Sequence, residues 1–195
     1  MNTIEEIAAQ NQKRAFEIIE AAHIIPLWES IHAKINLVGS LKTGLLMSHR
    51  DIDFHIYTPT LNVSKSFSVM AQLANNPAIK RIEFINSANT DEKCLEWHAW
   101  YQDTDEQLWQ IDLIQILKGS FYDGYFERVA KRILAILTPE TRLTILTLKH
   151  DTPETEKIMG IEYYQAVLQD GICNYADISE WRKKHPVTGI VNWMP

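Results

Sequence analysis

Cysteine is scarce in this sequence, and long apolar segments are missing. The 195 residues include two cysteines, Cys94 and Cys173, and no Cys-x-x-Cys pair. This argues against a disulfide framework or a structural zinc site and predicts two buried thiols. No apolar run approaches the roughly 18 residues of a membrane-spanning helix. The first 22 residues are charged and helical in period, unlike a secretion signal. We therefore expect a cytoplasmic protein with no membrane partner.

An excess of positive charge is also lacking. The net charge is −6 and the pI is near 5.6. Proteins that mainly bind the nucleic-acid backbone depend on Lys and Arg, so this balance predicts that nucleic acid is an unlikely partner. Hydrophobic residues make up 46% of the chain and charged residues 23%, which is enough apolar material for a sizeable core.

Hydrophobic periodicity predicts an α/β part followed by a helical part. Helical spacing covers residues 3–22, a short helix from Pro26, and residues 63–76. Strand patterns cover residues 34–39, 51–58, 80–88, 94–102 and 107–117, with a hairpin turn before the last. Further helices are expected to start at Ser120, at each Thr-Pro-Glu-Thr segment (138–141 and 152–155), and at Tyr175. We expect two regions, residues 1–118 and 119–195, that pack together.

The strand-like segment Asp51–Thr58 places two carboxylates on one face. Its strict alternation puts Ile52 on one face of the strand and both Asp51 and Asp53 on the other. Carboxylates about 7 Å apart on a strand repel each other and need a positive partner. A divalent ion such as Mg²⁺ is a natural partner, because it prefers hard oxygen ligands.

A glycine and a serine precede these acids. The apolar strand at residues 34–38 ends in Gly39 and Ser40, and ten residues separate Ser40 from Asp51. A strand that turns into a helix here exposes backbone N–H groups and a hydroxyl to an anion. Phosphates at this turn would also meet a metal ion held by the aspartates. The pattern therefore predicts a site for a nucleoside triphosphate with Mg²⁺.

These residues resemble the nucleotidyltransferases with a DNA polymerase β-like fold. In that superfamily a strand ends in Gly-Gly or Gly-Ser, and an acid-apolar-acid segment and a third strand acid follow. Gly39-Ser40, Asp51-Ile52-Asp53 and Ile111-Asp112-Leu113 match these elements, and the resemblance covers residues 34–117. It implies an α/β (α+β) fold with a mixed β-sheet flanked by helices, followed by a C-terminal helical region.

The resemblance also implies roles for individual residues. Asp51 and Asp53 would bridge two Mg²⁺ ions, and Asp112 would complete the second metal site beside the acceptor hydroxyl. Gly39 and Ser40 would hold the β- and γ-phosphates of the nucleoside triphosphate.

Three cations are further candidates for contact with the triphosphate. Lys42 and Arg50 flank the motif, and Lys149 lies on an expected C-terminal helix. A solvated surface charge is the ordinary interpretation of each and the one we favour. His55 shares the face of the aspartates, and we expect it to be a core histidine.

The expected activity is transfer of a nucleoside monophosphate to a small-molecule hydroxyl, as in antibiotic nucleotidyltransferases. At 195 residues the chain leaves little room for added nucleic-acid-binding domains. A protein side chain as acceptor, as in a toxin–antitoxin pair, is the alternative within the same chemistry. A non-catalytic nucleotide-binding protein of the same fold is the alternative outside it, and the intact set of three acids speaks against that. The base, the acceptor and the oligomeric state stay open.

Overall fold

The computed structural model describes residues 2–153 and 155–195. Its strands are β1 (Lys34–Leu37), β2 (Asp51–Thr58), β3 (Ile79–Ser87), β4 (Cys94–Gln102) and β5 (Leu108–Leu117). Its helices are α1 (Ile4–Ala21), α2 (Ile24–Glu29), α3 (Gly39–Thr43), α4 (Val63–Ala74), α5 (Tyr125–Ile136), α6 (Pro139–Asp151), α7 (Gly160–Leu168) and α8 (Tyr175–Lys184). The expected mixed α/β fold is confirmed.

The five strands form one sheet in the order β1-β2-β5-β4-β3. β2 and β5 run parallel, and every other neighbouring pair is antiparallel. The parallel pair is central, so β2 and β5 each have hydrogen-bonded neighbours on both sides. This pairing decides which side chains of β2 and β5 stand next to one another.

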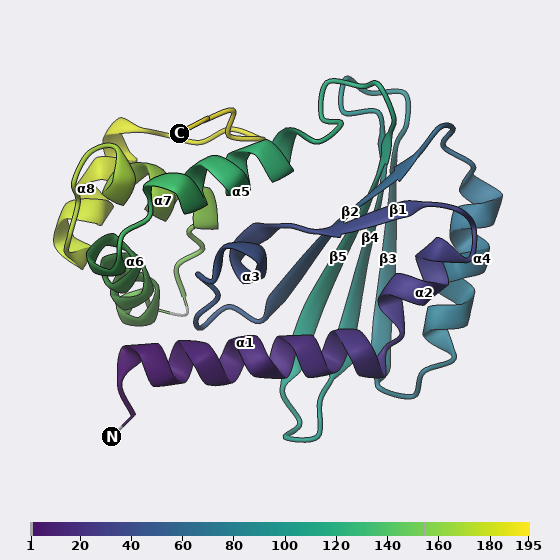
Figure 1. Cartoon of the computed structure of the whole chain (residues 1–195), viewed down its shortest axis with the longest axis horizontal. Coiled ribbons are helices and arrows are strands. Elements are labelled where there is room, and N and C mark those ends of the chain that lie inside the picture. The colour runs from purple at the N-terminus through teal and green to yellow at the C-terminus, as the bar shows by residue number, and fades with distance from the viewer. Residues whose placement is uncertain (1, 154) are drawn as a thin grey trace.

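One face of the sheet carries the main core. Ile52, Phe54 and Ile56 of β2 point into it and are fully buried, as their alternation predicts. Helices α2 and α4 cover this face at one end of the molecule (Figure 1). The opposite face therefore carries Asp51, Asp53 and His55.

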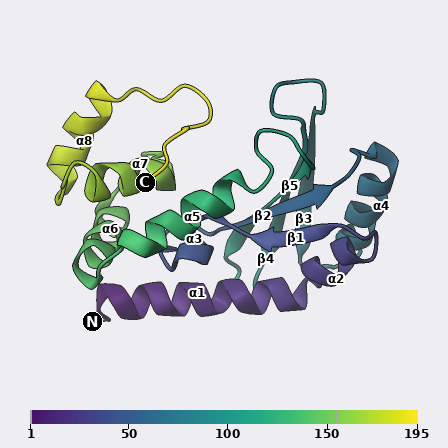
Figure 2. The ribbon, with the colours of Figure 1, turned by 45° about the horizontal axis from the view of Figure 1, so that its top comes forward.

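The helices α5 to α8 form the other end of the molecule, and α1 runs beneath both ends (Figures 1 and 2). A small cluster joins Ala8 of α1 to Met47 and to Leu146 of α6, all of them buried. Helix α5 is held to the sheet by Glu127, which accepts hydrogen bonds from Asn36 (2.9 Å) and Tyr57 (2.7 Å). The C-terminal helices therefore pack on the α/β part. The division at residue 118 into two regions stays a prediction.

Two expected helix starts are wrong. Residues 118–124 form turns and a bend. Helix α5 begins at Tyr125, and its N-cap is Gly124, with a φ of +68°, not Ser120. The second Thr-Pro-Glu-Thr segment follows the end of α6. Thr152 is the C-cap of that helix, and its hydroxyl donates to the Leu148 carbonyl (2.7 Å). The hydroxyl oxygen accepts from the Tyr163 hydroxyl (2.7 Å), and the next helix begins only at Gly160. Glu154 of this segment lies outside the described residues.

The remaining general expectations concern thiols and membranes. Cys94 is buried, as expected, whereas Cys173 is exposed at the surface, and both are free thiols. Across residues 2–153 and 155–195, no helix combines the length and apolar composition that crossing a membrane requires.

Candidate active site

Strand pairing brings the three predicted acids onto one face of the sheet. In the parallel pair β2–β5, Asp53 lies opposite Asp112, and Asp51 lies opposite Gln110. All four residues line one cavity. The alternation of each strand was predictable, but the register that sets Asp53 beside Asp112 joins segments about sixty residues apart and comes from the fold.

The turn after β1 is built around Asp53. Gly39 has a φ of +66°, and a β-carbon added to it would lie 1.9 Å from Oδ2 of Asp53. The backbone N–H of Ser40 hydrogen-bonds to Asp53, and the Val38 N–H donates to its carbonyl oxygen (2.9 Å). Only glycine leaves room for the carboxylate here, and the positive φ also favours glycine.

The pKa values of Asp51 and Asp53 are raised, because these carboxylates are buried and too little positive charge lies near them. Burial raises the pKa of Asp53 well above its usual range, and the charges of Asp51 and Asp112 raise it further. Burial also raises the pKa of Asp51, although Lys149 and His49 oppose that shift. Crowded carboxylates of this kind are stabilised by a bound cation, because it offsets their mutual repulsion.

The three aspartates are spread more widely than the tightest group of potential ligands in the described residues. That group is Glu92, Cys94 and Glu96, whose ligand atoms all lie within 4.8 Å of one another. Burial raises the pKa of Cys94 to about 12. Without a metal ion, the thiol is therefore protonated at neutral pH.

Lys149 is the lysine whose charge acts on the acids. The expectation that it is a solvated surface charge is wrong. Its side chain is buried, and Nζ donates to the Leu45 carbonyl (2.9 Å) and the Tyr164 hydroxyl (3.2 Å). Its charge lowers the pKa of both Asp51 and Asp53. Helix α6 places this lysine in the cavity wall, a position that the sequence around it does not reveal.

Lys42 and Arg50, the other two predicted cations, lie on the surface. Arg50 is exposed at the edge of the cavity, next to Asp51. Lys42 is exposed on α3 and is not among the described residues that line the cavity. His55 is buried and makes an edge-to-face contact with Phe126 at 5.0 Å between ring centroids; burial lowers its pKa to about 4.

Asp112 is held by two side chains that the sequence interpretation missed. Nδ1 of His98 lies 2.6 Å from Oδ1 of Asp112, and Nε2 of Gln110 lies 2.8 Å from the same oxygen. The hydrogen bond to Asp112 raises the pKa of His98. A signal for this pair existed, because a hairpin that pairs Gln102 with Leu108 also pairs His98 with Asp112.

The cavity lies between the sheet and the C-terminal helices and has a volume of about 850 Å³. The acids and Ser40 occupy one wall. The opposite walls are largely apolar and come from α5, the start of α7 with the segment before it, and the C-terminal tail: Phe126, Val129, Ala130, Ile133, Ile158, Met159, Ile161, Ile190 and Val191. Such a cavity has a charged end for a phosphate group and an apolar end for a planar ring.

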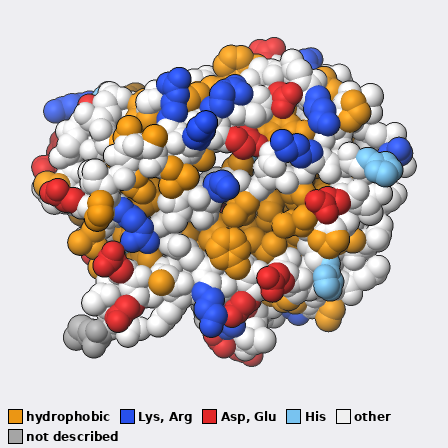
Figure 3. Space-filling model, in the orientation of Figure 1, with side chains coloured by type: hydrophobic (Ala, Val, Ile, Leu, Met, Phe, Trp, Pro, Cys, Tyr) orange, Lys and Arg blue, Asp and Glu red, His pale blue; other side chains and the backbone are white. Residues whose placement is uncertain are grey.

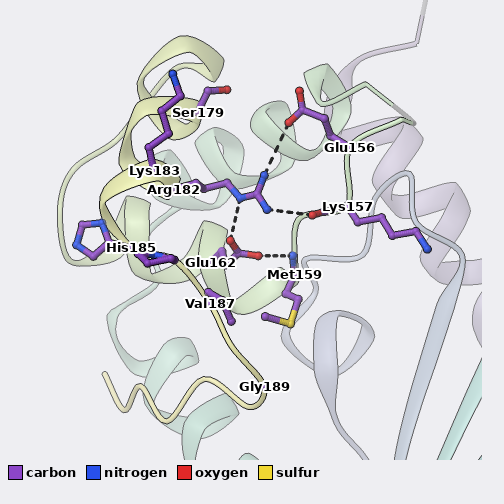
Figure 4. Close-up of a pocket in the computed structure, with 11 residues that line it drawn as sticks. Glu156, Lys157, Met159, Glu162, Ser179, Arg182, Lys183, His185, Val187 and Gly189 are labelled. Atoms are coloured by element: carbon purple, nitrogen blue, oxygen red, sulfur yellow. Dashed lines mark hydrogen bonds and ion pairs between the residues drawn. The ribbon is translucent and has the colours of Figure 1, made fainter.

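A second cavity of about 650 Å³ adjoins the first and shares Lys157, Met159 and Gly189 with it. Arg182 reaches across it (Figure 4), donating to Glu162 (2.9 Å) and to the Lys157 carbonyl (3.1 Å) and pairing with Glu156 (3.8 Å). Because these partners already neutralise the guanidinium, we interpret Arg182 as a link between α8 and the segment before α7.

Comparison with known proteins was informative only at the level of structure: no family model and no curated protein matches this sequence. A structure of Cid1, described in terms of its RNA terminal uridylyl transferase activity, aligns with a TM-score of 0.57 at 13% identity, covering 82% of this chain and 47% of Cid1. The fold is that of the nucleotidyltransferases. A structure of the Cid1 poly(U) polymerase with Mg 3′-dATP bound gives a TM-score of 0.56 at 16% identity over 80% of this chain and 49% of that one.

A third structure, the GLD-2/RNP-8 complex, aligns with a TM-score of 0.56 at 12% identity over 96% of this chain and 67% of that chain. The present chain thus spans about half the length of the Cid1 chains it matches. These similarities support the nucleotidyltransferase fold, but they do not support the small-molecule subtype or a protein side chain as acceptor.

The expectation that nucleic acid is an unlikely partner is wrong, because the Cid1 structures that share this fold are described by activity on RNA. A net charge of −6 sums over the whole surface and does not describe any one region. On the face in Figure 3, for example, most Lys and Arg side chains lie in the upper part. Overall acidity therefore does not exclude a nucleic-acid partner for this fold.

Proposed function

We propose that this chain is a Mg²⁺-dependent nucleotidyltransferase that moves a nucleoside monophosphate from a nucleoside triphosphate to an acceptor hydroxyl. The observation that carries the proposal is the convergence of Asp51, Asp53 and Asp112 on one sheet face beside the Gly39–Ser40 turn. Structures of this fold with MgATP, MgGTP and Mg 3′-dATP bound add support for Mg²⁺ and a triphosphate as ligands.

The residues present fit a metal-bound triphosphate. Oγ of Ser40 is buried in the cavity wall and has no hydrogen-bond partner among the described residues. Gly39 leaves room for the carboxylate of Asp53 beside the turn. The acids offer hard oxygen ligands of the kind that Mg²⁺ prefers. Ser40 and the backbone of its turn would receive the phosphates, and Lys149 would offset part of their charge.

The chemistry is an in-line displacement at the α-phosphorus. Two Mg²⁺ ions, when bound, neutralise charge on the attacking and leaving oxygens. Asp51 and Asp53 would hold the ions, and Asp112 would lie on the acceptor side. The acceptor oxygen forms a bond to the α-phosphorus, the bond to the β-phosphate oxygen breaks, and pyrophosphate leaves. A carboxylate oxygen of Asp112 accepts the hydroxyl proton. The apolar walls exclude water from the base and sugar.

Two classes of acceptor are compatible with this chemistry, and the experiment below includes both. A small molecule with a free hydroxyl is the first candidate, as in the antibiotic nucleotidyltransferases that the motif resembles. The 3′-hydroxyl of an RNA is the second candidate, favoured by the activities for which Cid1 is described. Both classes use the same attack on the α-phosphorus, so the proposed chemistry does not depend on the choice.

The proposal is tested by transfer of label from each of four α-³²P-labelled nucleoside triphosphates. The acceptors are a short RNA with a free 3′-hydroxyl, the same RNA with a 3′-deoxy end, and a panel of small hydroxyl compounds. We expect Mg²⁺-dependent label transfer and pyrophosphate release that disappear in Asp53→Asn. Failure of all four nucleotides both to react and to raise the melting temperature with Mg²⁺ would overturn the proposal.

A further inference from the structure

His98 lies beside the acids but outside their sequence motif. It stands on β4, directly opposite Asp112 on β5, and Nδ1 is 2.6 Å from Oδ1 of Asp112. An ionised carboxylate has no proton to give, so the ring N–H is the donor. The two side chains are about equally accessible, at 20% and 21%. This is a short, directed hydrogen bond at the edge of the cavity.

The other donor to Asp112 reaches the same oxygen. Nε2 of Gln110 is 2.8 Å from Oδ1. Two donors on Oδ1 fix the rotation of the carboxylate about χ2, and the hydrogen bonds found among the described residues leave Oδ2 unused. The fixed orientation reserves Oδ2 for a ligand in the cavity that Asp112 lines.

We propose that His98 is the positioning residue of Asp112, with Gln110 as its auxiliary, and that it sets the affinity of the metal site on the acceptor side. The inference rests on the proposed function, since it gives Asp112 a metal to bind. Donors that orient a ligating carboxylate commonly change metal affinity by about 10- to 100-fold when they are removed. The cause is preorganisation: without the donors, the carboxylate must lose its rotational freedom when the metal binds.

The test compares two replacements at one position. His98→Leu keeps an apolar body of similar size and removes the donor, whereas His98→Asn keeps an N–H close to the place of Nδ1. His150→Leu is the matched control, because His150 makes a similar contact with an exposed carboxylate, Asp151, at 3.1 Å and does not line the cavity. Gln110→Leu removes the second donor to Oδ1 and serves if His98→Leu does not fold.

The quantity measured is the affinity for Mn²⁺ in the presence of a non-hydrolysable nucleoside triphosphate. It is determined by electron paramagnetic resonance. We expect His98→Leu to weaken the acceptor-side Mn²⁺ by at least about 10-fold, with His98→Asn within about threefold of wild type. In transfer assays the half-saturating Mg²⁺ concentration should rise by a similar factor, with kcat at saturating Mg²⁺ changed less. The melting temperature without metal should be similar in all four variants.

Three outcomes decide the matter. Equal Mn²⁺ affinity in wild type and His98→Leu overturns the positioning role and leaves the proposed function standing. Equal weakening by His98→Asn and His98→Leu also overturns it, because the ring and not its donor would then matter. A wild-type protein that binds no Mn²⁺ with any triphosphate overturns the proposed function and this inference with it.

Discussion

Gly39 and Asp53 occupy adjoining space: a β-carbon on Gly39 would lie 1.9 Å from Oδ2 of Asp53 and 2.6 Å from its Cγ. Glycine is therefore required at position 39 for two reasons. Its φ is +66°, and the Asp53 carboxylate occupies the space that a β-carbon would need. The requirement links the Gly39–Ser40 turn to the acid beside it.

This relationship predicts the effect of Gly39→Ala. Positive φ costs a residue with a β-carbon about 1–2 kcal/mol, and the clash adds roughly 1–3 kcal/mol more. Gly171→Ala is the matched control, since its φ is +67° and nothing lies within 4 Å of its added β-carbon. In urea unfolding, Gly39→Ala should lose clearly more stability than Gly171→Ala. Equal losses would show that the clash is relieved by movement of Asp53.

Asp53→Asn should separate the metal role from a structural one. It removes one of three crowded charges at nearly constant volume, and the Ser40 N–H can still donate to the amide oxygen. We expect the variant to melt at or above the wild-type temperature without ligand. With Mg²⁺ and a triphosphate it should lose most of the stabilisation that wild type gains. Scanning fluorimetry checks both points; a destabilised apo protein with an unchanged ligand response would contradict the site.

Lys149→Met should affect both the fold and the nucleotide. It leaves the buried Leu45 carbonyl without its donor, which costs about 1–3 kcal/mol. It also removes the positive charge that stabilises ionised Asp51 and Asp53, so KM for the triphosphate should rise by roughly 10-fold, as for a charge-assisted contact. Lys42→Met, on the exposed side of α3, should leave KM within about twofold. An equal rise in both variants would instead favour Lys42 as a contact of the triphosphate.

The two thiols should differ in reactivity. Cys173 is exposed, whereas Cys94 is 4% exposed and its pKa is raised to about 12, so at pH 8 its reactive thiolate is nearly absent. In native protein we expect Ellman's reagent to modify one thiol quickly and the second only after unfolding. Raising the pH from 8 to 9 should not release the second thiol. Cys173→Ser should abolish the fast phase; a fast phase that survives this change would place Cys94 at the surface.

Local sequence was sufficient for much of the site. The strand Asp51–Thr58 has the bounds that its alternation predicts, and the Gly39–Ser40 turn follows β1 as expected. These features depend on residues close together in the chain, where the pleat and the conformational freedom of glycine act directly. Local signals also failed where neighbouring elements competed, as at Thr152, which ends α6 and whose hydroxyl oxygen accepts from Tyr163 of α7.

The sequence by itself determined the acids, their spacing on a common strand face and the glycine beside them. Tertiary structure decided which groups surround them. Lys149 donates to a carbonyl 104 positions away, and His98 reaches Asp112 only through the register of a hairpin. Both contacts depend on how whole helices and strands pack, and that packing is set by burial summed over many residues. No short pattern around Lys149 carries this information, and the pairing of His98 with Asp112 follows only once the register of the hairpin is known. The folded chain therefore reveals what supports the three aspartates.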